Sequence, residues 1–189
     1  MKDLFKHIRV MALGAMACAL LMTGCVPQEK TSVVMEPDLT PKTGVEIDFV
    51  QVHNDVMDAF GDDNPYVFIT DVYIDGTNDP KAVTITATCL DEANEEDAEH
   101  FAAAVVRRAS DAIATQSGEF TGGDQQSFGD VWGTFSLKLT IKRDSAEEGD
   151  YLLSLDIPAG EDIPLDPDIE TYEESWEEQR SMILNNTVY

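Results

Sequence analysis

The chain has few basic residues. It carries 12 Lys and Arg against 37 Asp and Glu in 189 residues, a formal net charge of −25. Nucleic-acid binding depends on Lys and Arg that neutralise phosphates, so this balance excludes a nucleic-acid ligand and disfavours docking of the folded part on an anionic membrane surface. The chain still holds 8 Phe, 5 Tyr and 2 Trp, which is enough to bury the core of a globular acidic protein.

Cysteine and histidine are equally scarce, with three of each. Cys18 and Cys25 lie near the N-terminus, which leaves Cys89 alone in the remainder and excludes an intramolecular disulfide there. Cys89 ends an alternating apolar stretch and is predicted to be a core residue. His53 and His100 have no metal-type partner or nucleophile at useful spacing, so both are predicted to be solvated, and the sequence predicts no catalytic residue, metal site or cofactor.

The apolar stretch near the N-terminus is short. Val10–Met22 has 13 residues, fewer than the about 20 that span a membrane. It follows the basic residues Lys2, Lys6 and Arg9 and ends in the sequence Met22-Thr23-Gly24-Cys25. This order resembles a bacterial lipoprotein signal peptide with its lipobox. The resemblance covers residues 1–25 only, and the alternatives are an ordinary secretory signal or an uncleaved anchor.

The resemblance implies that residues 1–24 are a signal peptide and that Cys25 is lipidated. The protein would then be lipid-anchored at the cell membrane, on its extracytoplasmic side, with the membrane as a partner through the lipid on Cys25. Loss of Lys2, Lys6, Arg9 and Asp3 with the signal changes the net charge from −25 to −27. Residues 25–43 contain several prolines and no apolar period, and are predicted to be a flexible tether after the lipidated cysteine.

Hydrophobic periodicity predicts a single acidic α+β domain over residues 44–189: a four-stranded antiparallel sheet of two hairpins, packed on a central helix, with additional N- and C-terminal helices. The first helix would begin at a capping box of Thr43 and Glu46 and end at Gly61, with a short strand over 45–52 as the alternative. The hairpins are predicted over 66–89 and 131–157, and the other helices over 94–118 and 168–185. Strand order is not predicted.

The outer face of the predicted sheet is rich in hydroxyl groups and is the candidate binding face. Its residues are Tyr73, Thr84, Thr86, Thr88, Trp132, Thr134, Ser136 and Lys138. Such a platform suits a polymer or a partner protein, while threonine is also simply common on exposed strands. The Gly122–Gly129 loop is a second candidate, as a mobile binding loop. Acidic loops at 62–64, 75–79 and 162–168 do not match calcium-loop spacing, so cation binding there is predicted to be diffuse.

These features predict a lipid-anchored envelope protein that acts as a non-enzymatic binding or interaction module. Its net negative charge makes another envelope protein with a basic surface the expected partner. The alternative is a small envelope hydrolase that depends on carboxylates, because two acids at about 5 or 9 Å suffice for glycoside cleavage.

Replacing the predicted lipid acceptor tests the anchoring. Cys25→Ser should abolish lipid modification and leave the domain folded, because the predicted tether separates the two. Intact-mass spectrometry of the wild-type mature protein should show an N-terminal Cys25 carrying acyl chains, and the variant should show none. An unmodified N-terminus at another residue would contradict the prediction.

Overall fold

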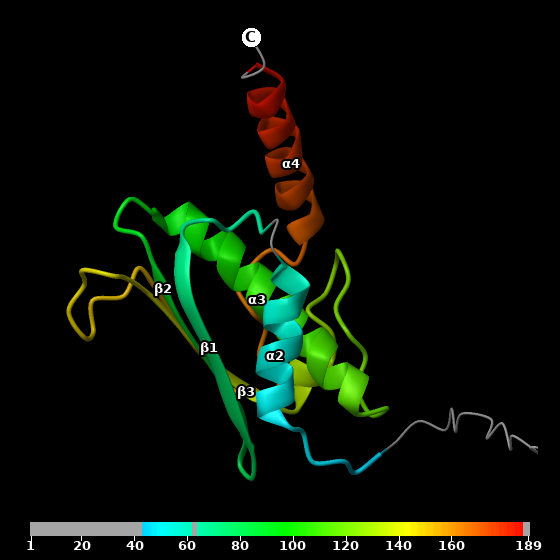
Figure 1. Ribbon diagram of the computed structural model, residues 1–189. Helices are drawn as coiled ribbons and strands as arrows, with labels where there is room; N and C mark the ends of the chain where they lie inside the picture. Colours follow the sequence, from blue (N-terminus) through cyan, green and yellow to red (C-terminus); the bar gives the residue numbers. More distant parts are fainter. Residues whose placement is uncertain (1–42, 62–63, 187–189) are drawn as a thin grey trace, which may run out of the picture. The chain divides into compact units, whose positions relative to one another are not determined.

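The computed structural model describes residues 43–61 and 64–186, with side chains up to Glu177. The predicted signal peptide, Cys25 and all of the predicted tether except Thr43 lie outside these residues. The elements are α2 (Phe49–Phe60), β1 (Ile69–Asn78), β2 (Lys81–Cys89), α3 (Glu95–Gln116), the 3-10 turn η1 (Val131–Gly133), β3 (Ser136–Arg143), β4 (Leu153–Ile157) and α4 (Ile169–Asn186), as Figure 1 shows. Among these helices, none combines the length and the apolarity of a membrane span.

The four strands form a mixed sheet, in the order β1-β2-β3-β4. The predicted hairpins are present, since β1 pairs antiparallel with β2 and β3 pairs antiparallel with β4. The central pair is different: β2 and β3 run parallel, with Ala82 opposite Ser136 and Cys89 opposite Arg143. The α+β class is confirmed, and the prediction of an entirely antiparallel sheet is wrong.

The length of α3 explains the parallel pair. Its 22 residues span about 33 Å at 1.5 Å per residue, close to the about 30 Å covered by the nine residues of β2. The helix therefore returns the chain to the end of the sheet where β2 began, and β3 starts from there in the same direction as β2. This is the usual consequence of a helical crossover between neighbouring strands.

The start of α2 differs from the prediction. Its N-cap is Asp48, whose carboxylate accepts hydrogen bonds from the backbone N–H groups of Val50 and Gln51, so the predicted Thr43 capping box is wrong. The residues before it are extended because two amide side chains bind their backbone. Asn78 bonds both the N–H and the carbonyl of Ile47, and Gln116 does the same for Asp48.

Two strand boundaries also shift. The hairpin predicted over 66–89 pairs as far as Asn78 and Lys81, so residues 75–78, rich in turn-forming residues, belong to β1 and not to the turn. Residues 131–133 form η1 instead of the beginning of a strand, because the N–H groups of Gly133 and Thr134 bond back to the carbonyls of Asp130 and Val131. The predicted helices over 94–118 and 168–185 correspond to α3 and α4.

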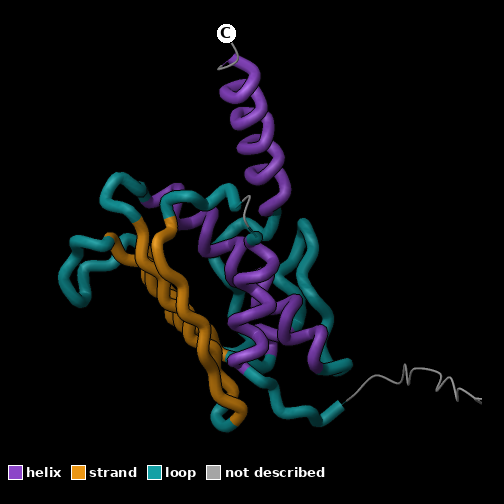
Figure 2. The backbone as a smooth tube through the Cα atoms, viewed as in Figure 1, coloured by secondary structure: helices purple, strands orange, loops and turns teal. Residues whose placement is uncertain are grey.

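Helices α2 and α3 lie on the same side of the sheet and bury its inner face (Figure 2). The apolar residues at helical spacing along the predicted 94–118 segment form one face of α3: Phe101, Val105, Ala109, Ala112 and Ile113 are all buried. Asn94 caps this helix through a capping box with Asp97, and three acids in the first turn favour its dipole. The inner face of the sheet contributes the alternate residues of each strand, such as Ile85 and Leu139. The two helices and the inner face of the sheet together form one two-layer core.

Truncating Phe101 tests this core. The side chain is 0% exposed, and its ring lies 5.6 Å from those of both Phe60 and Tyr66. Phe101→Ala should lower the free energy of unfolding by about 3–5 kcal/mol in urea denaturation. Val50→Ala, on the exposed side of α2, is the control and should change it by less than about 0.5 kcal/mol. A loss below about 1 kcal/mol for Phe101→Ala would contradict the assigned packing.

Candidate functional site

The structure brings most of the predicted binding face together. Tyr73, Thr84, Thr86, Thr88, Ser136 and Lys138 lie on the outer side of the sheet, away from α2 and α3. Two members lie elsewhere. Thr134 is exposed but precedes β3, and Trp132 belongs to η1, where it is only 4% exposed. The prediction assumed that Trp132 belongs to a strand, whereas residues 131–133 form a 3-10 turn.

The outer face carries charges of both signs. Its middle row consists of hydroxyl side chains on all four strands: Tyr73, Thr86, Thr140 and Ser154. The neighbouring row pairs Asp75 with Thr84 and Lys138 with Asp156. Lys142 lies beside Thr88, which lies beside Asp71. The excess of acids over bases in this chain is therefore not concentrated on the sheet face.

A second surface collects acids without bases. An open groove of about 470 Å³ lies between residues 126–130, η1 and residues 160–167. Trp132 and Phe128 line its apolar part together with Ile163 and Leu165, and the acids Asp130, Glu161 and Asp162 line its polar part. This volume lies within the usual range for ligand pockets, about 300–1,000 Å³. We take this groove, called here the acidic groove, as the candidate functional site.

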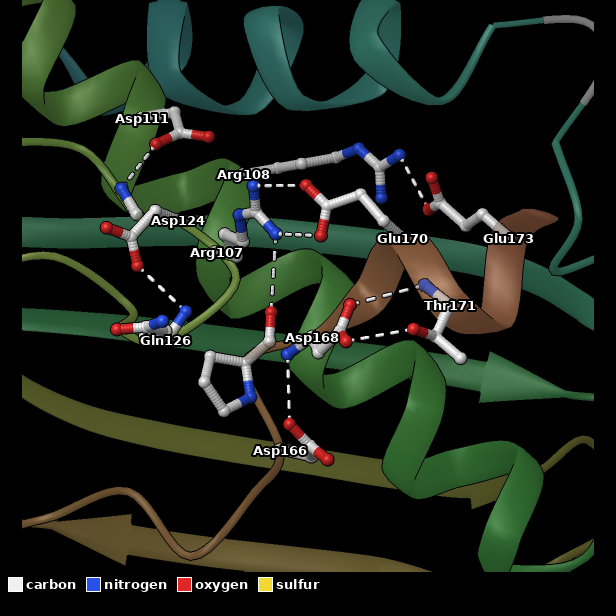
Figure 3. Close-up of polar contacts among 12 residues, drawn as sticks. Arg107, Arg108, Asp111, Asp124, Gln126, Asp166, Asp168, Glu170, Thr171 and Glu173 are labelled. Atoms are coloured by element: carbon white, nitrogen blue, oxygen red, sulfur yellow. Dashed lines mark hydrogen bonds and ion pairs between the residues drawn. The ribbon is translucent and has the colours of Figure 1, made fainter.

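The first wall of the acidic groove is the predicted glycine-rich loop, which is bound tightly to α3. The carboxylate of Asp111 accepts a hydrogen bond of 2.7 Å from the N–H of Gly123 (Figure 3). Gly129 has a φ of +84°, and a Cβ there would lie 2.5 Å from the carbonyl oxygen of Thr121 and 2.6 Å from Ser110 Oγ. Only glycine fits this approach, so the loop, which the sequence predicts to be a mobile binding loop, lies closely against α3.

Arg107 of α3 fixes the second wall. Its guanidinium forms two hydrogen bonds of 2.6 Å to the carboxylate of Glu170 and donates to the carbonyl oxygen of Pro167 at 3.3 Å (Figure 3). Its stem lies under the first wall, because a Cβ at Gly123 would be 2.8 Å from Arg107 Cγ. The hydrogen bonds from Arg107 lower the pKa of Glu170, and those same bonds raise the pKa of Arg107.

The neighbouring Arg108 holds the first turns of α4 against the aromatic core. It donates to Glu173 at 2.8 Å, and its guanidinium lies 4.4 Å from the centre of the Phe60 ring. The hydroxyl of Tyr66 donates to the same Glu173 oxygen at 3.3 Å. Burial, reinforced by the charge of Glu173, raises the pKa of Tyr66, so this tyrosine is a neutral hydrogen-bond donor.

The lining of the acidic groove suits binding of a cation. It contains no Lys, Arg, His or Cys, and its exposed acids Glu161 and Asp162 form no ion pair with any described residue. One oxygen of Asp130 accepts a hydrogen bond from the N–H of Thr121 at 2.7 Å, which orients that carboxylate. The indole N–H of Trp132 is buried and has no acceptor among the described residues. Such a donor is costly to leave unbonded.

The cysteine, the histidines and the acidic loops considered in the sequence lie in different parts of the fold. Cys89 is buried as predicted, and burial raises the pKa of its thiol. The histidines are not simply solvated: His53 Nδ1 accepts from the N–H of Ile74, and the His100 ring stacks on Tyr172 at 4.2 Å. Residues 62 and 63 of one acidic loop lie outside the description. In the part of the chain that is described, no three His, Cys, Asp or Glu side chains are grouped to hold a metal ion.

Sequence reasoning noticed both loops of the acidic groove but not that they meet. The glycine content of 122–129 and the prolines of 158–167 marked each as irregular. Their contact depends on Arg107 and on a hydrogen bond of 2.8 Å from the N–H of Gly160 to the carbonyl of Trp132. The chain matches no protein-family model, no curated protein and no solved structure. The case for this site therefore depends on its geometry.

A pair of glycine substitutions tests the seating of the first wall. Gly129→Ala and Gly149→Ala both place alanine at positive φ, which costs about 1–2 kcal/mol. The Cβ at Gly149 would meet no atom within 4 Å, whereas the one at Gly129 would clash as described above. Gly129→Ala should therefore lower the free energy of unfolding by about 1–3 kcal/mol more than Gly149→Ala in urea denaturation. Equal losses would show that the loop is not tightly seated.

Proposed function

We propose that this chain is a lipid-anchored, extracytoplasmic envelope protein that binds another envelope protein and does not catalyse a reaction. The observation that carries the proposal is the acidic groove, with two walls fixed by α3 and no basic side chain in its lining. Fixed walls reduce the ordering cost of binding, which favours a recognition surface. The signal-peptide resemblance supplies the compartment and the anchor at Cys25.

The charge of the chain supports a partner with a basic surface. A net charge of −25 with an acidic groove attracts a basic surface and speeds its association. The sheet face, with Lys138 and Lys142 among its acids, is less suited to such a partner. It is the second candidate contact surface, because its hydroxyl row matches the sequence prediction.

The hydrolase alternative would draw on the same groove. Glu161 and Asp162 are the acids available there, together with Asp130, whose carboxylate already accepts the Thr121 N–H. Both Glu161 and Asp162 are exposed on a loop. A general acid at neutral pH needs a carboxyl group whose pKa is raised, usually by a buried apolar setting. An exposed setting suits cation binding better than proton transfer.

Site-specific photo-cross-linking in living cells tests the proposal. A benzophenone amino acid at Gln126, on the rim of the acidic groove, should yield one protein adduct of defined mass in the membrane fraction. The same residue at Thr86, exposed on the sheet face, is the matched control and should yield none. The adduct at Gln126 should weaken with Cys25→Ser, because the anchor confines both proteins to one surface.

Each other outcome has a distinct meaning. An adduct at Thr86 but not at Gln126 would assign binding to the sheet face and overturn the choice of the acidic groove. No adduct at either position would contradict a contact module. Full cross-linking with Cys25→Ser would contradict the role of the anchor in bringing the two proteins together.

A further inference from the structure

The acidic groove has two chemically different halves. Ile163 and Leu165 are half-buried and give it an apolar side, continuous with the buried Trp132. Glu161 and Asp162 are exposed at the other side and are not paired with any described basic residue. A ligand that fills both halves needs an aliphatic part and a positive end. Lysine and arginine side chains combine these two properties.

The charges around the acidic groove leave it available to such a ligand. Arg107 is the cation that supports its walls, and its guanidinium is occupied by Glu170 and by the carbonyl of Pro167. Asp130 adds a third carboxylate, oriented by the N–H of Thr121. Carboxylates that line one groove add to each other's field. An incoming cation is therefore favoured and an anion repelled.

Trp132 contributes to the apolar part of the acidic groove. It is 4% exposed and its Nε1–H has no acceptor among the described residues. Because the Nε1 atom itself is buried, a ligand in the groove contacts the indole ring and not this N–H. The combination of unpaired acids and an apolar side fits a lysine or arginine side chain of the basic partner proposed above.

We propose that the acidic groove binds a lysine or arginine side chain presented by an extended basic segment of a partner protein. The aliphatic stem lies along Ile163 and Leu165, and the positive end meets Glu161 and Asp162. This inference rests on the proposed function as a contact module and names the chemistry of its partner.

Peptide titration followed by NMR tests the inference. The protein is the full-length chain with Cys25→Ser, labelled with ¹⁵N, in non-ionic detergent. The probes are acetylated and amidated pentapeptides with glycine at four positions and arginine, lysine or citrulline at the centre. Citrulline keeps the shape of arginine without its charge. The reporter is the indole N–H resonance of Trp132, which Trp132→Phe identifies by removing it.

The arginine and lysine peptides should shift this resonance in a saturable way, with binding of the citrulline peptide at least about tenfold weaker, as expected for loss of one charge-assisted hydrogen bond. The double substitution Glu161→Gln with Asp162→Asn should lower the affinity for the arginine peptide by about tenfold or more. The matched control is Glu147→Gln with Glu148→Gln, which removes two exposed adjacent acids from another loop and should change the affinity by less than about twofold.

The inference is overturned by no saturable shift with either basic peptide, by equal binding of the citrulline peptide, or by an equal loss of affinity in both acid-to-amide variants. Calcium chloride and spermidine are titrated in the same way, as small cations that carry no peptide group. If either moves the Trp132 resonance as the peptides do, with the same dependence on Glu161 and Asp162, the groove binds small cations and not a peptide.

The peptide titration and the cross-linking experiment can fail independently of each other. If cross-linking at Gln126 succeeds and none of the peptides binds, the contact module stands and the basic-segment assignment is wrong. If the peptides bind as expected and no cross-link forms in cells, the groove has the stated chemistry but the proposed envelope partner is wrong.

Discussion

The Arg107 side chain of α3 joins two segments that are distant from it in sequence, the glycine-rich loop and the start of α4. Its stem supports the glycine-rich loop at Gly123, and its two hydrogen bonds to Glu170 hold the first turn of α4. Its hydrogen bond to the carbonyl oxygen of Pro167 holds the end of the loop that leads into α4. Basic residues are scarce in this chain, 12 against 37 acids, so one planar cation that binds a carboxylate and a carbonyl together has a large effect on the fold. Without it, Glu170 would face Asp168 with no compensating cation, and both walls of the acidic groove would lose their common support.

The position of Arg107 depends in turn on α3. The helix runs the full length of the sheet and presents residues on several sides: Phe101 to the aromatic core, Arg107 to the two loops and Arg108 to α4. Its many alanines allow the surrounding elements to approach closely. The same length makes β2 and β3 parallel, which places the start of β3 and the preceding η1 at one end of the sheet. The acidic groove is built at that end, partly from η1.

Local patterns predicted the local structure well. The cap at Asn94, the stripe along α3, the two hairpins and the range of α4 follow from spacing and capping, which depend on neighbours in the sequence. The direction of β3 relative to β2 did not follow, because strand periodicity is the same in both directions. The start of α2 was misjudged because Asn78 and Gln116, both distant in sequence, bind the backbone of Ile47 and Asp48.

The candidate sites show the same division between local and distant information. Alternation along β2 and β3 correctly placed Thr84, Thr86, Thr88 and Lys138 on one face, since a strand fixes which side each residue takes. Trp132 was misplaced because the hydrogen bonds of η1 interrupt that alternation. The acidic groove could not be predicted, because its walls are about 30 residues apart in the chain and are joined by contacts such as those of Arg107 and the Gly160–Trp132 bond, which depend on the tertiary fold.

The strong acidity of the chain connects its stability with its proposed partner. Some acids have structural roles, as Asp48 and Asp97 do at helix starts and Asp111 does under the glycine-rich loop. The others repel one another across a small fold, which lowers its stability. A basic segment in the acidic groove would offset part of that repulsion where acids are concentrated, so relief of repulsion adds to the contacts it makes. Added salt screens the repulsion and the attraction alike, so the free protein should gain stability under the same conditions in which the complex weakens.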